Sequence, residues 1–140
     1  MKVLLDTCVL SELRRSDGEP CVRQSVESFV DSDLYMSVLT VGEIVKGIAL
    51  LSPSKKKQDL QRWIQGLEQR YGDRILPVDR DVSHIWGEIT SRARTQGVTL
   101  PVVDGLIAAT ALRHGLHLMT RNTSDFATTG VLLINPWEQV

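Results

Sequence analysis

The sequence is poor in several features that would narrow its class. Among its 140 residues only two are cysteines, Cys8 and Cys21, which are too few for a disulfide framework. No apolar run is long enough to cross a membrane. The net charge is −1, so no overall basic field draws the chain to nucleic acid or to a membrane surface. We expect a reducing, cytoplasmic compartment without a signal peptide, and any polyanionic substrate must be held by a local patch or by metal ions.

Common nucleotide and zinc motifs are also missing. The chain has no Gly-x-x-x-x-Gly-Lys loop and no Gly-x-Gly-x-x-Gly fingerprint. Its three histidines, His84, His114 and His117, lack His-x-x-x-His spacing, and the cysteines lack zinc-site spacing. These absences argue against P-loop and dinucleotide-binding proteins and against a zinc site.

What is present is an alternation of short apolar runs with helical patterns. The expected strands are 2–5, 34–38, 75–78, 116–120 and 131–134, and the expected helices are 12–15, 22–30, 40–51, 55–71, 80–96 and 101–114. This order predicts a single domain, 1–140, of the α/β class: a central parallel sheet flanked by helices, with the first strand in the middle. The helices on either side of Ser52 and Pro53 could project from the sheet as a hairpin.

Three carboxylates fall where predicted strands end or helices begin. Asp6 follows the first strand, Glu43 follows the second, and Asp104 opens the helix of the most apolar segment. Each has a structural explanation of its own: a turn for Asp6, a capping box with Thr40 for Glu43, and the helix dipole for Asp104. In open α/β sheets, however, sites lie beyond the carboxyl ends of the strands, so all three are expected at one edge.

A fourth acid, Asp125, follows a later strand and on its own is typical of a loop or N-cap residue. Like charges at close range call for a cation. Hard oxygen ligands suit Mg²⁺, or Mn²⁺, better than Zn²⁺. A carboxylate-held Mg²⁺ can activate water and neutralise a phosphodiester, and the number of ions, one or two, stays open.

The same residues carry a resemblance to a known family. The segments Leu4–Glu12, Thr40–Glu43, Val103–Ala111, Thr120–Phe126 and Asn135–Trp137 resemble, in order and spacing, the motifs of PIN-domain proteins, above all toxins of the VapC/FitB type from bacterial toxin–antitoxin pairs. This resemblance implies a PIN-like three-layer fold and a Mg²⁺-dependent ribonuclease. It also implies a homodimer inhibited by a small DNA-binding antitoxin.

The resemblance assigns the metal site to Asp6, Glu43 and Asp104, and Asp125 joins them as a catalytic candidate. Thr7, Thr120 and Asn122 are expected to support the site. In two places the chain departs from the family pattern: Cys8 stands where many relatives have Asn, and either Asn122 or Asp125 can be the residue that completes the site.

Substrate contacts are signalled only weakly. Arg14, Arg15 and Arg121 lie on helix ends or loops near the expected crevice, so they are the candidates for binding RNA phosphates. The run Lys55–Lys57 is typical of a solvated helix face, and the three tryptophans are expected to be packing residues.

Two other classes of α/β protein also carry acidic residues just after the ends of their strands. A receiver-like signalling module would need an acidic pair near the first strand and a late lysine, but the late strand ends in Thr120 and Arg121. A haloacid-dehalogenase-like phosphatase needs Asp-x-Asp, and Cys8 occupies the second position. A catalytically silent PIN-like domain that binds RNA or a partner remains the alternative to a nuclease.

Overall fold

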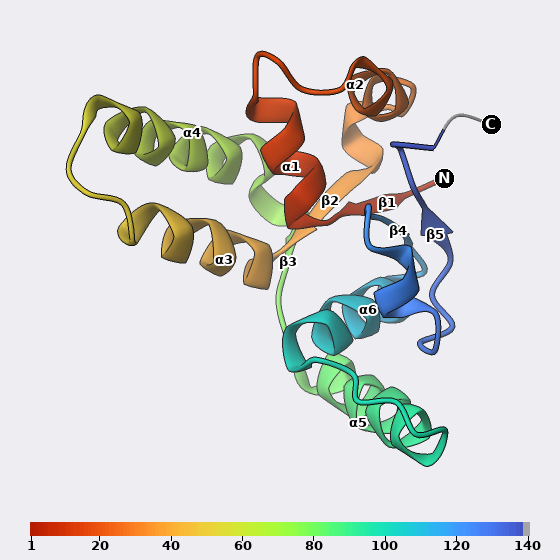
Figure 1. Cartoon of the computed structure of the whole chain (residues 1–140). Helices are drawn as coiled ribbons and strands as arrows, with labels where there is room; N and C mark the ends of the chain where they lie inside the picture. The colour runs from red at the N-terminus through yellow and green to blue at the C-terminus, as the bar shows by residue number, and fades with distance from the viewer. Residues whose placement is uncertain (139–140) are drawn as a thin grey trace.

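The computed structural model describes residues 1–138 and shows an α/β domain (Figure 1). The last two residues of the predicted domain, 139 and 140, lie outside the described residues. The strands are β1 (Val3–Leu5), β2 (Leu34–Ser37), β3 (Ile75–Leu76), β4 (His117–Met119) and β5 (Leu133–Ile134). The α-helices are α1 (Thr7–Arg14), α2 (Pro20–Glu27), α3 (Val38–Ala49), α4 (Lys55–Tyr71), α5 (Arg80–Thr95) and α6 (Val102–His114). Short 3₁₀ turns are η1 (Asp31–Asp33), η2 (Gly72–Arg74) and η3 (Thr123–Phe126).

The five strands form one sheet in the order β3-β2-β1-β4-β5, and every neighbouring pair is parallel. Leu4 is in register with Tyr35 on one side and with Leu118 on the other. The first strand is therefore central, as predicted. Because all strands run the same way, the residues that follow β1, β2 and β4 reach the same edge of the sheet.

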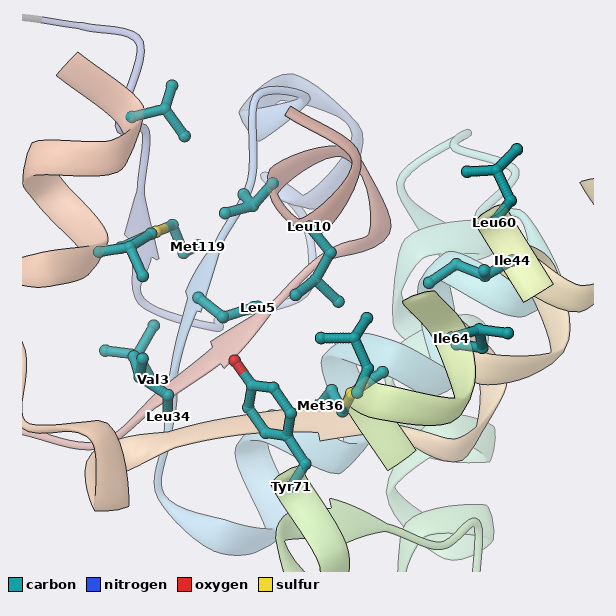
Figure 2. Close-up of a cluster of buried hydrophobic side chains, with 14 of the residues drawn as sticks. Val3, Leu5, Leu10, Leu34, Met36, Ile44, Leu60, Ile64, Tyr71 and Met119 are labelled. Atoms are coloured by element: carbon teal, nitrogen blue, oxygen red, sulfur yellow. The ribbon is translucent and has the colours of Figure 1, made fainter. Parts of the chain in front are cut away.

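Helices cover both faces of the sheet, and β1 contributes to both cores. Val3 and Leu5 point into the cluster that packs against α1 to α4, whereas Leu4 points into the cluster formed with α5 and α6. Figure 2 shows the first cluster, to which Leu5 of β1, Met36 of β2 and Tyr71 of α4 all contribute. This alternation along a fully buried strand confirms the predicted three-layer fold.

Helices α3 and α4 project from the sheet as a hairpin, as the residues around Ser52 and Pro53 suggested (Figure 1). Ile44 and Ile48 of α3 share a cluster with Leu60 and Ile64 of α4. The outer surface of the hairpin keeps apolar residues in solvent, and Leu50 is 78% exposed. No described helix is both long enough and apolar enough to span a bilayer.

Helix starts are where the sequence prediction was wrong. The first helix begins at Thr7 rather than Glu12, because the Asp6 carboxylate caps it by accepting a 2.8 Å hydrogen bond from the Thr7 N–H. The third helix begins at Val38 rather than Thr40, because the Ser37 hydroxyl accepts from the Leu39 N–H at 3.0 Å. The predicted capping box between Thr40 and Glu43 is therefore absent, and Glu43 lies inside the helix.

The end of α6 agrees with the prediction. Arg113 and His114 occupy its last turn, and Gly115 follows with a left-handed φ of 66°. Glycine takes this conformation without the steric cost that other residues meet. The turn redirects the chain into β4 and so brings Thr120 back to the edge of the sheet.

Candidate functional site

Asp6 lies at the centre of the carboxyl edge of the sheet. Its backbone N–H donates to the Met119 carbonyl at 3.0 Å, which ties the end of β1 to the end of β4. Its side-chain Oδ1 accepts from the Thr7 N–H, and Oδ2 accepts from the Thr120 hydroxyl, each at 2.8 Å. Only 8% of Asp6 is exposed. The helix cap and the Thr120 hydroxyl thus hold this carboxylate in one orientation.

Glu43 reaches the same edge from α3. With the helix start capped by Ser37, the Glu43 carboxylate is not used by its own backbone. Its Oε1 accepts a 2.8 Å hydrogen bond from the Thr7 hydroxyl. Thr7 therefore connects two of the predicted site acids: its N–H binds Asp6, and its hydroxyl binds Glu43.

Asp104 lies in the first turn of α6 and is half-buried. Burial raises the pKa of its carboxyl above the ordinary value, and the negative charges of Asp6, Asp125 and Glu43 raise that pKa further. Within residues 1–138 no lysine or arginine forms an ion pair with any of these four acids. The four carboxylates thus share one electrostatic neighbourhood that no protein cation neutralises.

Asp125 contributes the charge of its side chain at this edge, whereas the recorded contacts of Asn122 use its backbone. Asp125 lies on η3, and its charge acts on Asp104 more strongly than that of Glu43 does. Asn122 is exposed, its N–H donates to the Thr120 hydroxyl at 3.1 Å, and its carbonyl accepts from the Asp125 N–H at 3.0 Å. The backbone of Asn122 thus shapes the turn that carries Asp125, and this arrangement favours Asp125 as the fourth acid.

Cys8 fills the space beside Asp6 and Thr120. Its Sγ lies 3.9 Å from Asp6 Oδ2 and 3.6 Å from Thr120 Oγ1. Burial raises the pKa of the thiol, and the neighbouring Asp6 charge adds to that effect. Cys8 is therefore a neutral packing residue whose thiol donates a weak hydrogen bond to the Asp6 oxygen that also accepts from the Thr120 hydroxyl.

A hard divalent cation fits the chemistry of this donor set. No three Asp, Glu, His or Cys side chains among residues 1–138 are already drawn together into a metal cage. The four acids nevertheless supply only oxygen donors, and their mutual repulsion acts on Asp104. A bound cation would replace that repulsion with attraction. The residues that could hold it are Asp6, Glu43 and Asp104, with Asp125 beside them.

The predicted phosphate-binding arginines are divided between two places. Arg14 and Arg15 line a cleft that also contains Thr7 and Glu43. Arg121 instead stacks on Trp137, with the guanidinium carbon 5.2 Å from the ring centroid. The same cleft is lined by Lys56 and Trp63, neither of which the sequence singled out. These two residues can be recognised only from the packing of α4 beside α1. In the sequence, Lys56 is simply the middle residue of a run of three lysines.

Comparisons with known proteins agree with this geometry. The model of the PIN domain family matches residues 3–132. The chain is 40% identical to Toxin FitB from Neisseria gonorrhoeae over 96% of this chain and 98% of that protein. It is 35% identical to VapC ribonuclease Y4jK from Sinorhizobium fredii over 97% and 98% of the two chains.

Solved structures give the same assignment. The structure of FitAB bound to a DNA fragment superposes with a TM-score of 0.93 at 38% identity, covering 99% of this chain and 97% of that one. FitAcB from Neisseria gonorrhoeae superposes with a TM-score of 0.92 at 40% identity, covering 98% and 99%. With its strand order, its edge of carboxylates and a family match over nearly its whole length, this chain belongs to the PIN-domain family.

Proposed function

We propose that this chain is the ribonuclease toxin of a toxin–antitoxin pair, an endoribonuclease that hydrolyses RNA phosphodiester bonds with the help of Mg²⁺. The observation that carries the proposal is a group of four carboxylates without a cationic ion-pair partner among the described residues: Asp6, Glu43 and Asp125, whose charges act on the fourth, Asp104. Relatives with the names of a toxin and a ribonuclease, each at least 35% identical over nearly the whole chain, support it.

The chain's own residues prepare the site before any substrate arrives. Thr7 and Thr120 hold the Asp6 carboxylate in one orientation, and Thr7 also directs Glu43 toward the same edge. Asp104 completes the set from the opposite helix layer. When bound to these oxygens, Mg²⁺ supplies an acidified water molecule and positive charge beside the phosphate. Mn²⁺ is the expected substitute, since it accepts the same oxygen ligands.

Activity on labelled RNA tests the proposal directly. The purified protein should cleave the RNA with Mg²⁺ and lose that activity in excess chelator. Asp6→Asn and Asp104→Asn should each fold and yet lose at least about 100-fold in rate, because each removes charge from the cation site without changing volume. Asp73→Asn, at an exposed acid in η2, is the control and should cleave normally. Full cleavage by Asp104→Asn, or cleavage in chelator, would refute the metal-dependent mechanism.

The partner we propose is a small DNA-binding antitoxin. Similar chains have been solved in the structure of FitAB bound to a DNA fragment and in a toxin–antitoxin complex from Klebsiella pneumoniae. An anionic pocket is blocked most simply by a cationic side chain, and the planar fork of arginine pairs with two carboxylate oxygens at once. Co-expression with a small basic protein from the adjacent reading frame should give a stable complex without nuclease activity. A complex that cleaves RNA at the rate of the free enzyme would contradict this proposal.

A homodimer is proposed on separate grounds. A groove of about 580 Å³ runs along α3 and reaches Val103 of α6, with Val38, Leu39 and Leu50 among its apolar walls. Val38 and Leu50 are exposed, at 44% and 78%. Apolar side chains grouped in this way are typical of an interface, and a second copy would cover them. Light scattering should report a dimer, and Leu50→Glu should shift it to monomer; a wild-type monomer at high concentration would contradict the assignment.

We also place the protein in the cytoplasm. Both cysteines are free thiols in the structure, as expected in a reducing compartment. Cytoplasmic RNA would then be within its reach.

A further inference from the structure

A cleft between α1 and the α3–α4 hairpin continues from the carboxylate group. Thr7 and Glu43 form the end that it shares with those acids, and Lys56 and Trp63 of α4 line its opposite side. Its volume is about 300 Å³, which lies at the lower end of the range for ligand sites. The cleft therefore extends away from Thr7 and Glu43 of the candidate site.

Three cationic side chains, Arg14, Arg15 and Lys56, line this cleft. Arg15 is engaged by Asp17 and Glu12, at N–O distances of 3.4 and 3.8 Å. In the part of the chain that the structure describes, no carboxylate lies within ion-pair distance of Arg14 or Lys56. The charges of these two residues are thus free to meet a ligand.

Cationic side chains in this cleft would offset the repulsion between RNA phosphates and the site carboxylates. An RNA strand must bring a phosphodiester next to four carboxylates, in a protein whose net charge of −1 offers no general attraction. Cations that bind the neighbouring phosphates lower the cost of that approach. Arg14 and Lys56 line the same cleft as Glu43, along which such phosphates would pass.

Apart from Ser11, the remaining side chains that line the cleft are apolar. Ile44, Ile48, Leu51 and Leu60 contribute to it together with the half-buried Trp63. Bases stack on aromatic side chains without regard to sequence, so this surface suits a ribose or a base. A protein helix could use the apolar walls as well, but the free cations and the continuity with Glu43 favour a strand of RNA.

We propose that this cleft holds the RNA on one side of the scissile phosphate, with Arg14 and Lys56 binding adjacent phosphates and Trp63 contacting a base. This inference rests on the proposed ribonuclease function and adds to it a substrate subsite. It gives Lys56 a role that its neighbours Lys55 and Lys57 lack, since neither of them lines the cleft and the Lys57 ammonium instead donates to the Leu51 carbonyl at 3.0 Å.

RNA binding can be measured apart from cleavage. We would use the Asp104→Asn protein in chelator and record the fluorescence anisotropy of a labelled single-stranded RNA of mixed sequence over a series of salt concentrations. Arg14→Ala and Lys56→Ala should each weaken binding by about 3- to 10-fold, and each should reduce the salt slope by about 0.7, the value for one phosphate contact on a single strand. Lys56→Arg should restore binding, and Lys55→Ala is the matched control that should bind as the parent does.

The outcomes separate this inference from the function on which it rests. If the wild-type protein cleaves RNA but Arg14→Ala and Lys56→Ala bind it with unchanged affinity and salt slope, the subsite is wrong and the cleft is left to a protein segment. If the wild-type protein neither binds nor cleaves RNA, the proposed function and the subsite both fail. If Lys56→Ala and Lys55→Ala weaken RNA binding equally, the subsite is also wrong, because binding would then depend on net charge and not on the position of the lysine.

Discussion

The Thr7 hydroxyl donates a 2.8 Å hydrogen bond to Glu43 Oε1 and thereby joins the first turn of α1 to the middle of α3. The Thr7 N–H binds Asp6 at the same time. One residue therefore sets the relative orientation of two acids from different segments, the N-cap of α1 and the interior of α3. Each helix has its own N-cap, Asp6 for α1 and Ser37 for α3, so neither helix depends on the contact between Thr7 and Glu43. We therefore assign this contact to the positioning of the site acids.

Thr7→Val should weaken the proposed cation site while leaving the helix cap in place, because valine keeps the backbone N–H but loses the hydroxyl. A hydrogen bond of this kind contributes about 1 kcal/mol, so we expect about a fivefold loss of Mn²⁺ affinity by calorimetry and a similar loss of cleavage rate. Thr7→Ser keeps the hydroxyl and should restore both. Equal metal affinity in the valine and serine variants would contradict the positioning role of Thr7.

Asp104 makes stability depend on pH in a predictable direction. Its folded-state pKa is raised, so the folded protein holds this proton more tightly than the unfolded chain does. Stability is therefore lost as pH rises from the ordinary aspartate pKa through the raised one. In metal-free protein at pH 7, Asp104→Asn should raise Tm, and the gain should shrink as the pH falls toward 4, where the wild-type carboxyl is protonated in both states.

With Mn²⁺ added, the wild type should have a higher Tm than Asp104→Asn, because the wild-type carboxylates then gain a counter-ion. Wild-type Tm should rise with Mn²⁺ concentration, and Asp104→Asn should respond less. Asp73→Asn should respond as the wild type does. A lower Tm for Asp104→Asn than for wild type in chelator at pH 7 would show that burial and the neighbouring acids do not disfavour the ionised Asp104 carboxylate in the folded protein.

Asp125 and Asn122 can be separated by substitution. We expect Asp125→Asn to reduce Mn²⁺ affinity several-fold, because it removes one of the charges that act on Asp104. Asn122→Ala should have a smaller effect, since the contacts of Asn122 with Thr120 and Asp125 use its backbone. Calorimetry on both variants decides between them, and a larger loss at Asn122→Ala would make Asn122 the residue that completes the site.

Gly105 allows α6 to approach Trp86 of α5. A Cβ at position 105 would lie 3.0 Å from Trp86 Cδ1 and 3.2 Å from Leu100 Cδ2. Gly105→Ala should therefore lower the free energy of unfolding by about 1–3 kcal/mol through overpacking. Because Asp104 precedes it, cleavage should fall as well.

Gly66→Ala is the matched control for that measurement. It lies within α4, where a new Cβ meets nothing within 4 Å. The same substitution there should raise the free energy of unfolding by about 0.5–1 kcal/mol, because alanine restricts the unfolded chain and favours the helix. Denaturation curves for the two variants should thus move in opposite directions. A neutral Gly105→Ala would show that Trp86 has room to shift.

The sequence by itself determined the order of elements, the central first strand and the candidate acids. Apolar runs such as Val3–Leu5 and the amphipathic pattern of Lys55–Tyr71 are local signals, and they reappear in the structure almost unchanged. The acids could be picked out because parallel strands must end at one edge. The helix starts were harder: Asp6 and Ser37 compete with later residues for the same capping role, and local spacing does not decide between them.

Only the tertiary structure decided how those acids are held and what lies beside them. The contacts of Thr7 with Glu43 and of Thr120 with Asp6 join residues 36 and 114 positions apart. Likewise Lys56 faces the cleft beside α1 only because the α3–α4 hairpin folds back next to it. Such contacts depend on the packing of whole layers, and no pattern along the chain encodes them, because side chains far apart in sequence meet only after the sheet has formed.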